Sequence, residues 1–179
     1  MNFKDNHIIE GCLKGDRIFQ KQLYNQYKVF LFGVCMRYAQ NKTEAEDILS
    51  EGFYKILKDL HQFSGNASLQ SWMRKVMVNT ALMHIRKYRR IKYSDFDEIQ
   101  EKKQSQPDYS LFESNRAQAI IAMIHELPLP QQTIFNLRAM DGYSFKEIST
   151  QLEINESTVR SHYLRARKKL QFLLQKELY

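Results

Sequence analysis

Apolar side chains recur every three to four positions along most of this chain, as they do on one face of an α-helix. The clearest stripe runs from Phe19 to Tyr38 and follows Asp16, a residue type that caps helix N-termini. Over residues 1–94 no stretch alternates apolar and polar residues as a half-buried strand does. We therefore predict an all-α fold.

Three more helices are predicted in the first part of the chain. A short helix ends near Gly15, and the long helix that carries the clearest stripe is expected to end near Asn41. Thr43 and Glu46 have the spacing of a capping box, so the third helix is expected to begin there. A fourth helix is predicted from about Ser68. Its inner stripe is expected at Leu69, Trp72, Val76 and Thr80.

The last part of the chain predicts a helix-turn-helix. An amphipathic helix ends at the prolines of residues 127–130, because a residue before proline avoids helical dihedral angles. Ser144 and Glu147 form a second predicted capping box, and Asn155 is expected to cap the last helix. A short capped helix, a turn over residues 153–155 and a longer helix describe this motif. The buried positions of the last helix are predicted to be Val159, Tyr163, Ala166 and Leu170.

Hydrophobic periodicity lapses between Ser94 and Phe112, where the sequence is polar and mixed in charge. This composition is typical of a flexible linker. We predict two small helical domains, residues 1–93 and 113–179, joined by a linker over residues 94–112. The chain has only 6 glycines and 3 prolines, which fits helices better than a fold with many tight turns.

Charge points to an anionic partner. The net charge is +7, and it divides into +8 over residues 1–94, −4 over residues 95–126 and +3 over residues 127–179. Two basic units suit nucleic acid, although many basic proteins bind nothing charged. We find neither an apolar run long enough to span a membrane nor a signal peptide, so we expect a cytoplasmic protein without direct membrane insertion.

Catalytic motifs are not found in the sequence. The five histidines are scattered without metal-ligand spacing, and the two cysteines are expected to be reduced thiols. A phosphate-binding glycine loop and a nucleophile elbow are also lacking from the sequence. We expect no enzymatic activity, no cofactor and no metal.

The outer face of the last helix suits duplex DNA. Short hydroxyl side chains and an arginine in its first turns have the right length to reach base edges in a major groove. Basic side chains further along suit phosphates. The candidates are Ser157, Thr158, Arg160, Ser161, Arg165 and Lys168. The alternative is a helical hairpin whose basic face is only solvated.

A second basic segment ends the first domain. Residues 86–92 include Arg86, Lys87, Arg89 and Arg90. The loop and helix before it offer aromatic and amide side chains able to stack on and read unpaired bases, which are Phe63, Asn66, Trp72, Arg74 and Asn79. The alternatives are a solvated helix end, where cations also favour the dipole, and a core position for Trp72.

The helix that begins near Thr43 has the opposite character. Its outer face carries Asp47, Ser50, Glu51 and Tyr54. DNA would avoid this acidic patch, so a protein partner is one interpretation and a plain solvated face is the other.

In this order the motifs resemble the sigma factors of bacterial RNA polymerase, specifically the two-domain extracytoplasmic-function group. Individually each motif is modest, and the order makes them specific. The resemblance covers nearly the whole chain outside the linker. The motifs are Thr43-Glu44-Ala45-Glu46-Asp47-Ile48, the series Phe63, Trp72, Asn79 and Arg86, Leu127-Pro128, Gly142 with Glu147-Ile148, Thr158-Val159-Arg160-Ser161, and Arg165-Ala166-Arg167-Lys168-Lys169-Leu170.

The resemblance implies a transcription initiation factor that binds core RNA polymerase, recognises the −10 and −35 elements of promoter DNA and helps to open the duplex. It also implies an anti-sigma factor as a partner. Polymerase contacts would come from Asp47, Ser50 and Glu51. The −10 contacts would come from Phe63, Gly65, Asn66, Arg74 and Asn79, with Arg86, Lys87, Arg89 and Arg90 beside them. The −35 contacts would come from Ser157, Thr158, Arg160, Ser161, Arg165 and Lys168.

Two other functions remain open from the sequence. A helix-turn-helix regulator that acts without polymerase fits the C-terminal motif, but such proteins usually carry an α/β domain first. A helical adaptor that binds only protein would leave both basic surfaces unexplained. The family usually has a turn glycine where Glu153 stands, which predicts strain there if its backbone is left-handed.

Overall fold

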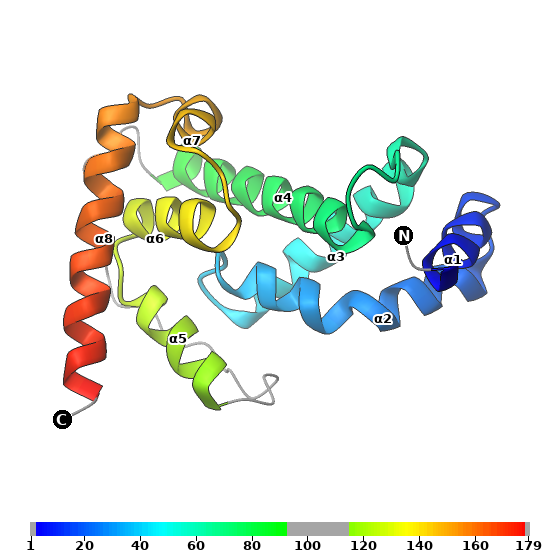
Figure 1. Cartoon of the computed structure of the whole chain (residues 1–179), viewed down its shortest axis with the longest axis horizontal. Coiled ribbons are helices and arrows are strands. Elements are labelled where there is room, and N and C mark those ends of the chain that lie inside the picture. The colour runs from blue at the N-terminus through cyan, green and yellow to red at the C-terminus, as the bar shows by residue number, and fades with distance from the viewer. Residues whose placement is uncertain (1–2, 93–114, 178–179) are drawn as a thin grey trace. The chain divides into compact units, whose positions relative to one another are not determined.

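The computed structural model describes residues 3–92 and 115–177, and every regular element within these ranges is a helix (Figure 1). The predicted all-α fold is confirmed. The chain divides into two compact units, residues 1–91 and 92–179. The predicted linker over residues 94–112 lies outside the described residues, so the exact domain bounds stay a prediction.

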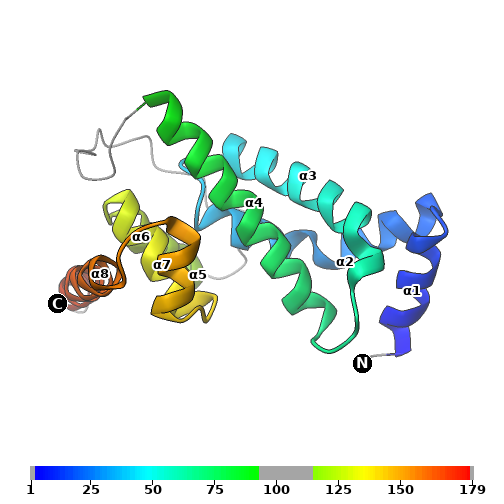
Figure 2. The same ribbon diagram turned by 90° about the horizontal axis from the view of Figure 1, so that it is seen from above.

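The first unit contains four α-helices and one short 3₁₀ turn among its described residues. Helix α2 packs against both α1 and α3, and α4 contacts α3 (Figure 2). Their fully buried side chains include Leu23, Leu31, Ile48, Ile56 and Met73, which form an apolar core. The elements are α1 (Phe3–Leu13), α2 (Arg17–Met36), α3 (Lys42–Asp59), η1 (Leu60–Gln62) and α4 (Leu69–Lys92).

Helix α2 begins as predicted and ends earlier than predicted. The Asp16 carboxylate accepts the backbone N–H of Ile18 at 2.8 Å, which caps the helix. The helix ends at Met36 rather than near Asn41. Tyr38 continues the apolar stripe and is buried, although it lies beyond the helix, because the chain stays against the core there.

The capping box predicted at Thr43 and Glu46 is wrong. The cap of α3 is Asn41, whose side-chain oxygen accepts the backbone N–H of Glu44 at 2.9 Å. The Glu44 carboxylate in turn accepts the backbone N–H of Gln40 at 2.7 Å. Asn41 and Glu44 have the same spacing as Thr43 and Glu46, so the reciprocal pattern forms two residues earlier.

The inner stripe of α4 is displaced from the prediction. Leu69 and Thr80 are buried as predicted, but Met73 and Met77 are fully buried in place of Trp72 and Val76, which are half-buried. Gly52 of α3 allows this packing, because a Cβ there would overlap the Met77 sulfur. Methionine side chains adapt to such an irregular seam better than a β-branched residue does.

The second unit places one long helix against several short ones. Helix α8 packs against α5, α6 and α7, and its core includes Met123, Ile124, Leu127, Ala166 and Leu170 (Figure 1). The five C-terminal residues of the helix that starts at Leu129 are wound as a π-helix, η2. The elements are α5 (Asn115–His125), α6 (Leu129–Phe135), η2 (Asn136–Met140), α7 (Phe145–Leu152) and α8 (Glu156–Glu177).

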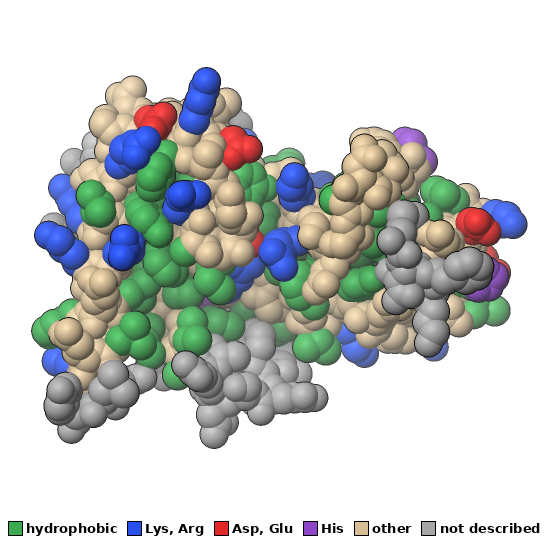
Figure 3. All heavy atoms as spheres, viewed as in Figure 1, with side chains coloured by type: hydrophobic (Ala, Val, Ile, Leu, Met, Phe, Trp, Pro, Cys, Tyr) green, Lys and Arg blue, Asp and Glu red, His purple; other side chains and the backbone are tan. Residues whose placement is uncertain are grey.

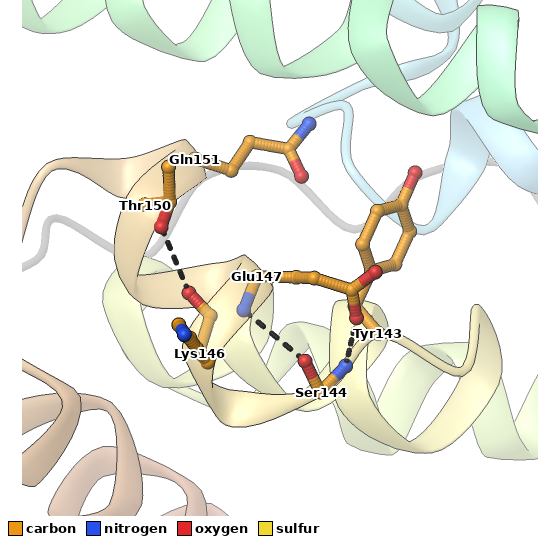
Figure 4. Close-up of a pocket in the computed structure, with 6 residues that line it drawn as sticks. All are labelled: Tyr143, Ser144, Lys146, Glu147, Thr150 and Gln151. Atoms are coloured by element: carbon orange, nitrogen blue, oxygen red, sulfur yellow. Dashed lines mark hydrogen bonds between the residues drawn. The ribbon is translucent and has the colours of Figure 1, made fainter.

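The helix-turn-helix is formed by α7 and α8. The capping box of α7 is confirmed, since Ser144 Oγ accepts the Glu147 N–H at 3.2 Å and the Glu147 carboxylate accepts the Ser144 N–H at 2.7 Å (Figure 4). Glu153 then turns the chain in a left-handed conformation, with φ 58° and ψ 40°. Helix α8 begins at Glu156, directly after the predicted cap residue, Asn155.

We expect Glu153→Gly to stabilise the second unit by about 1 kcal/mol, because a left-handed conformation costs a residue with a Cβ about 1–2 kcal/mol and glycine gives back part of this in the unfolded chain. Chemical denaturation followed by circular dichroism measures the free energy of unfolding. Glu153→Ala keeps the Cβ and is expected to bring no gain. Equal stability of the glycine and alanine variants would contradict the strain.

Candidate nucleic-acid and protein interfaces

The candidate side chains of α8 lie on its outer face and on its two flanks. The helix buries Val159, Ala166 and Leu170, and a helical turn of 100° per residue then directs Ser157 and Lys168 to the opposite side. Among the predicted −35 residues, those with exposed side chains are Ser157, Arg160, Arg165 and Lys168, and those with half-buried side chains are Thr158 and Ser161. Lys and Arg side chains gather over α7 and α8 on the face shown in Figure 3.

Arg160 is held in place by two neighbours. Its Nε and Nη2 both donate to Oε1 of Glu156, at 3.0 and 2.5 Å, one helical turn earlier. Its guanidinium carbon lies 4.5 Å from the centre of the Phe145 ring, in the first turn of α7. The side chain is still 56% exposed, so it remains accessible while it is held.

Sequence reasoning missed Phe145 and Arg138. The guanidinium carbon of Arg138 lies 4.9 Å from the centre of the same Phe145 ring, and its Nη1 donates to the Tyr143 carbonyl at 3.2 Å. In the sequence Phe145 is one apolar residue inside a capping box. Only the turn between the two helices brings its ring to Arg160, and the sequence carries no signal for that approach.

A pocket lies along the first helix of the motif (Figure 4). Several of its polar groups serve the helix itself: Ser144 and Glu147 bond each other's backbone, and Thr150 Oγ1 donates to the Lys146 carbonyl at 3.1 Å. Burial raises the pKa of the Tyr143 hydroxyl, and the charges of Asp141 and Glu147 raise it further. The lining residues are Tyr143, Ser144, Lys146, Glu147, Thr150 and Gln151.

Phe63 of the loop before α4 and Trp72 of α4 itself form an aromatic pair. The Phe63 and Trp72 rings lie 5.7 Å apart at an angle of 54°, and both side chains are half-buried. Gly65 has a φ of 76°, a left-handed conformation that favours glycine. The side chain of Asn66 in the same loop and that of Asn79 in α4 are exposed. The loop and the first turn of α4 therefore present a half-exposed aromatic surface, and the loop and α4 also carry exposed amides.

Arg74 is not brought together with that pair. It follows Trp72 by two residues in α4, so the two side chains leave the helix about 200° apart. Its guanidinium carbon lies 5.1 Å from the centre of the Phe30 ring of α2. The side chains of Arg86 and Lys87 are exposed, whereas those of Arg89 and Arg90 lie outside the described part of the chain.

The acidic face of α3 is less negative than the sequence suggests. Asp47 and Ser50 are exposed, and Tyr54 beside them is 67% exposed. The Glu51 carboxylate, however, accepts from Lys55 Nζ at 2.6 Å and contacts His84 Nε2 of α4 at 2.7 Å. Glu51 therefore links α3 to α4, and Asp47 is the more exposed of the two predicted carboxylates.

The Glu51 carboxyl makes the stability of the first unit depend on pH. The hydrogen bonds from Lys55 and then His84 lower the pKa of the Glu51 carboxyl below its usual range. Because this pKa is lower in the folded state, the ionised carboxylate stabilises the fold at pH values above its unfolded-state pKa of about 4.3. The contribution is lost as the pH falls through the folded-state pKa.

As the pH falls from about 5 to 3, we expect the free energy of unfolding to decrease less for Glu51→Gln than for the wild-type chain. The difference is expected to be under about 1 kcal/mol, because the Glu51–His84 pair is half-exposed. Thermal unfolding followed by circular dichroism across this pH range measures the difference. Parallel pH profiles for the two proteins would show that the link does not stabilise the fold.

Among the described residues, no helix is long and apolar enough to cross a membrane. Within the same ranges, no group of three or more His, Cys, Asp and Glu side chains is arranged to hold a metal ion.

Comparison with known proteins gives matches in both units. Residues 23–91 match the family model of sigma-70 region 2, and residues 117–170 match that of sigma-70 region 4. The chain is 27% identical to the RNA polymerase sigma-H factor of Pseudomonas aeruginosa, over 96% of this chain and 94% of that protein. It is 28% identical to the ECF RNA polymerase sigma-E factor of Escherichia coli K12, over 91% of this chain and 90% of that protein.

Two solved structures share the fold. The sigma factor RpoE of Bartonella quintana, solved in complex with the anti-sigma factor NepR, matches with a TM-score of 0.53 and 21% identity, over 87% of this chain and 96% of that one. CnrH, solved in complex with the cytosolic domain of CnrY, matches with a TM-score of 0.51 and 18% identity, over 96% of this chain and 97% of that one.

Proposed function

The chain belongs to the sigma-70 family of RNA polymerase sigma factors, in its extracytoplasmic-function group, and on this premise we propose that it is a transcription initiation factor. It binds core RNA polymerase and directs the enzyme to specific promoters by recognising the −10 and −35 elements. The observation that carries this proposal is the match of both units, in the family's order, to regions 2 and 4.

We propose that the second unit holds the −35 element as intact duplex. The exposed hydroxyl of Ser157 and the guanidinium of Arg160 lie in the first turns of α8, where they can reach base edges in a major groove. Arg165 and Lys168 lie further along the same helix and suit phosphates. The remaining proposed contacts, Thr158 and Ser161, are half-buried.

The first unit would take the −10 element as a melted strand. An unpaired base can stack on the half-exposed Phe63–Trp72 pair. Gly65 shapes the loop before α4, and the exposed Asn66 of that loop can read the base. Stacking and binding of flipped bases offset the free energy of unpairing the duplex. Further contacts are proposed for Arg74, Asn79, Arg86, Lys87, Arg89 and Arg90. The chain itself would form and break no covalent bonds.

The polymerase would bind the outer face of α3. Asp47 and Ser50 are exposed there, and Tyr54 adds an exposed aromatic side chain. Glu51 contributes by holding α3 against α4, in addition to any direct contact. We also propose an anti-sigma factor as a partner and the cytoplasm as the location, as membership of this family implies.

The length of the predicted linker suits two units that bind separate elements of one promoter. Nineteen residues, 94–112, would span at most about 65 Å if fully extended, at ~3.4 Å per residue. Two turns of duplex span about 70 Å, a distance that such a linker and the widths of the two units can cover together. A helix-turn-helix regulator acting without polymerase does not account for the region 2 match over residues 23–91.

Co-elution with core RNA polymerase tests the proposal, followed by transcription from promoter libraries. We expect a stable complex and transcripts that depend on both the chain and the promoter sequence. A chain that shifts duplex DNA on its own and never co-elutes with the polymerase would favour the regulator.

A further inference from the structure

We propose that Phe145 positions Arg160 for base recognition, and so determines specificity at the base pair that Arg160 reads, although it touches no base itself. This inference rests on the proposed function, since it concerns how the second unit reads the −35 element. Its basis is the geometry of three side chains that the turn between α7 and α8 brings together.

The ring of Phe145 is a fixed platform. Phe145 is the first residue of α7, directly after the Ser144 cap, so its backbone is set by the capping box. Its ring meets the Tyr163 ring edge-on at 5.5 Å, and Tyr163 in turn stacks on Phe135 of α6 at 6.1 Å. The Phe145 ring is therefore held by Tyr163 of α8, which is itself held by Phe135 of α6.

Arg160 lies against that platform and keeps an exposed side chain. Its guanidinium carbon is 4.5 Å from the ring centre, within the range of a cation–π interaction. The Glu156 carboxylate accepts two of its N–H groups, so a ring and a carboxylate hold the guanidinium from two directions. An arginine fixed in this way loses less conformational freedom when it binds a base than a free one does.

Arg138 shares the same platform at 4.9 Å and is anchored separately, by its bond to the Tyr143 carbonyl. Loss of the ring would remove this contact from both arginines. A test must separate an effect that passes through Arg160 from one that passes through Arg138 or through the fold. A double-mutant cycle makes this separation, because only coupling through Arg160 disappears when Arg160 is absent.

The experiment uses the full chain bound to core RNA polymerase and measures promoter affinity on the preferred promoter and on single-base variants of the −35 element. Phe145→Leu keeps an apolar side chain and removes the aromatic face. We expect a loss of about threefold to fivefold in discrimination, the scale of one exposed cation–π contact, at the positions where Arg160→Ala also loses it. Phe145→Tyr keeps the face and is expected to retain discrimination.

The double variant Phe145→Leu with Arg160→Ala is expected to discriminate no worse than Arg160→Ala alone. Phe172→Leu is the matched control, because Phe172 is an exposed ring of α8 that lies beside Lys176, about three turns beyond Arg160. It is expected to leave discrimination unchanged. An equal loss from Phe145→Leu with and without Arg160, or a uniform loss on every sequence, would overturn the proposal.

A second measurement does not depend on DNA. In the wild-type chain the Phe145 ring current is expected to shift the NMR signals of the Arg160 side chain, and Phe145→Leu is expected to abolish this shift while circular dichroism stays unchanged. Unshifted Arg160 signals in the wild type would contradict the platform. The proposed function has a different contradicting result: a wild-type chain that does not bind polymerase, or whose promoter affinity does not depend on the −35 sequence.

Discussion

Asp47→Lys is expected to weaken binding to core RNA polymerase by at least about a hundredfold, because a like charge placed at a complementary interface costs several kcal/mol. Asp47 is exposed on α3, whereas the Glu51 carboxylate is paired with Lys55 and His84. The substituted side chain stays in solvent in the free protein. The fold is therefore expected to survive, with an unchanged circular dichroism spectrum.

Glu10→Lys provides the matched control for this charge reversal. Glu10 is an exposed carboxylate of α1, in the same unit and outside the proposed polymerase surface. The control changes the net charge of the chain by the same amount, so it reports any general electrostatic effect. Titration of labelled core polymerase with each variant gives the dissociation constants. Normal binding by Asp47→Lys, or an equal loss with both variants, would refute the acidic surface.

Arg160→Ala is expected to cost about 1–3 kcal/mol in affinity for the preferred promoter and to relax specificity at one position of the −35 element. The loss is specific because the guanidinium can donate two hydrogen bonds to one base edge. The ring of Phe145 and the carboxylate of Glu156 hold it in a defined place before DNA arrives. The variant leaves Glu156 without its partner, so part of any uniform loss reflects that unneutralised carboxylate.

Arg167→Ala serves as the control for Arg160→Ala. Arg167 is an exposed arginine of the same helix that we do not assign to base reading. We expect its loss to weaken binding to all sequences to a similar degree, as removal of a phosphate contact does. Promoter affinities of the two holoenzymes on single-base variants give the measurement. A uniform loss with Arg160→Ala as well would exclude base recognition by this side chain.

Helix type and order follow from the sequence because they depend on local patterns. The stripe from Phe19 to Val34, the Asp16 cap and the Ser144–Glu147 box each involve residues within a few turns of one another. Where two local patterns compete, the sequence does not decide between them. Asn41 with Glu44 and Thr43 with Glu46 offer the same spacing, and the end of α2 at Met36 leaves Asn41 free to cap α3.

The candidate interfaces were predictable as faces of helices and not as arrangements of side chains. Exposure of Ser157, Arg160 and Lys168 follows from the buried positions of α8 alone. Contacts between distant segments do not follow in this way. The approach of His84 to Glu51 spans 33 residues, and that of Phe145 to Arg160 depends on a tight turn at Glu153.

Footprinting of the reconstituted holoenzyme on one of its promoters tests the central claim most directly. We expect permanganate-reactive, unpaired thymines at the −10 element only when the chain and core polymerase are both present. Protection of intact duplex is expected about two helical turns upstream in the same complex. Duplex protection by the chain alone, with no unpaired thymines when polymerase is added, would contradict the account.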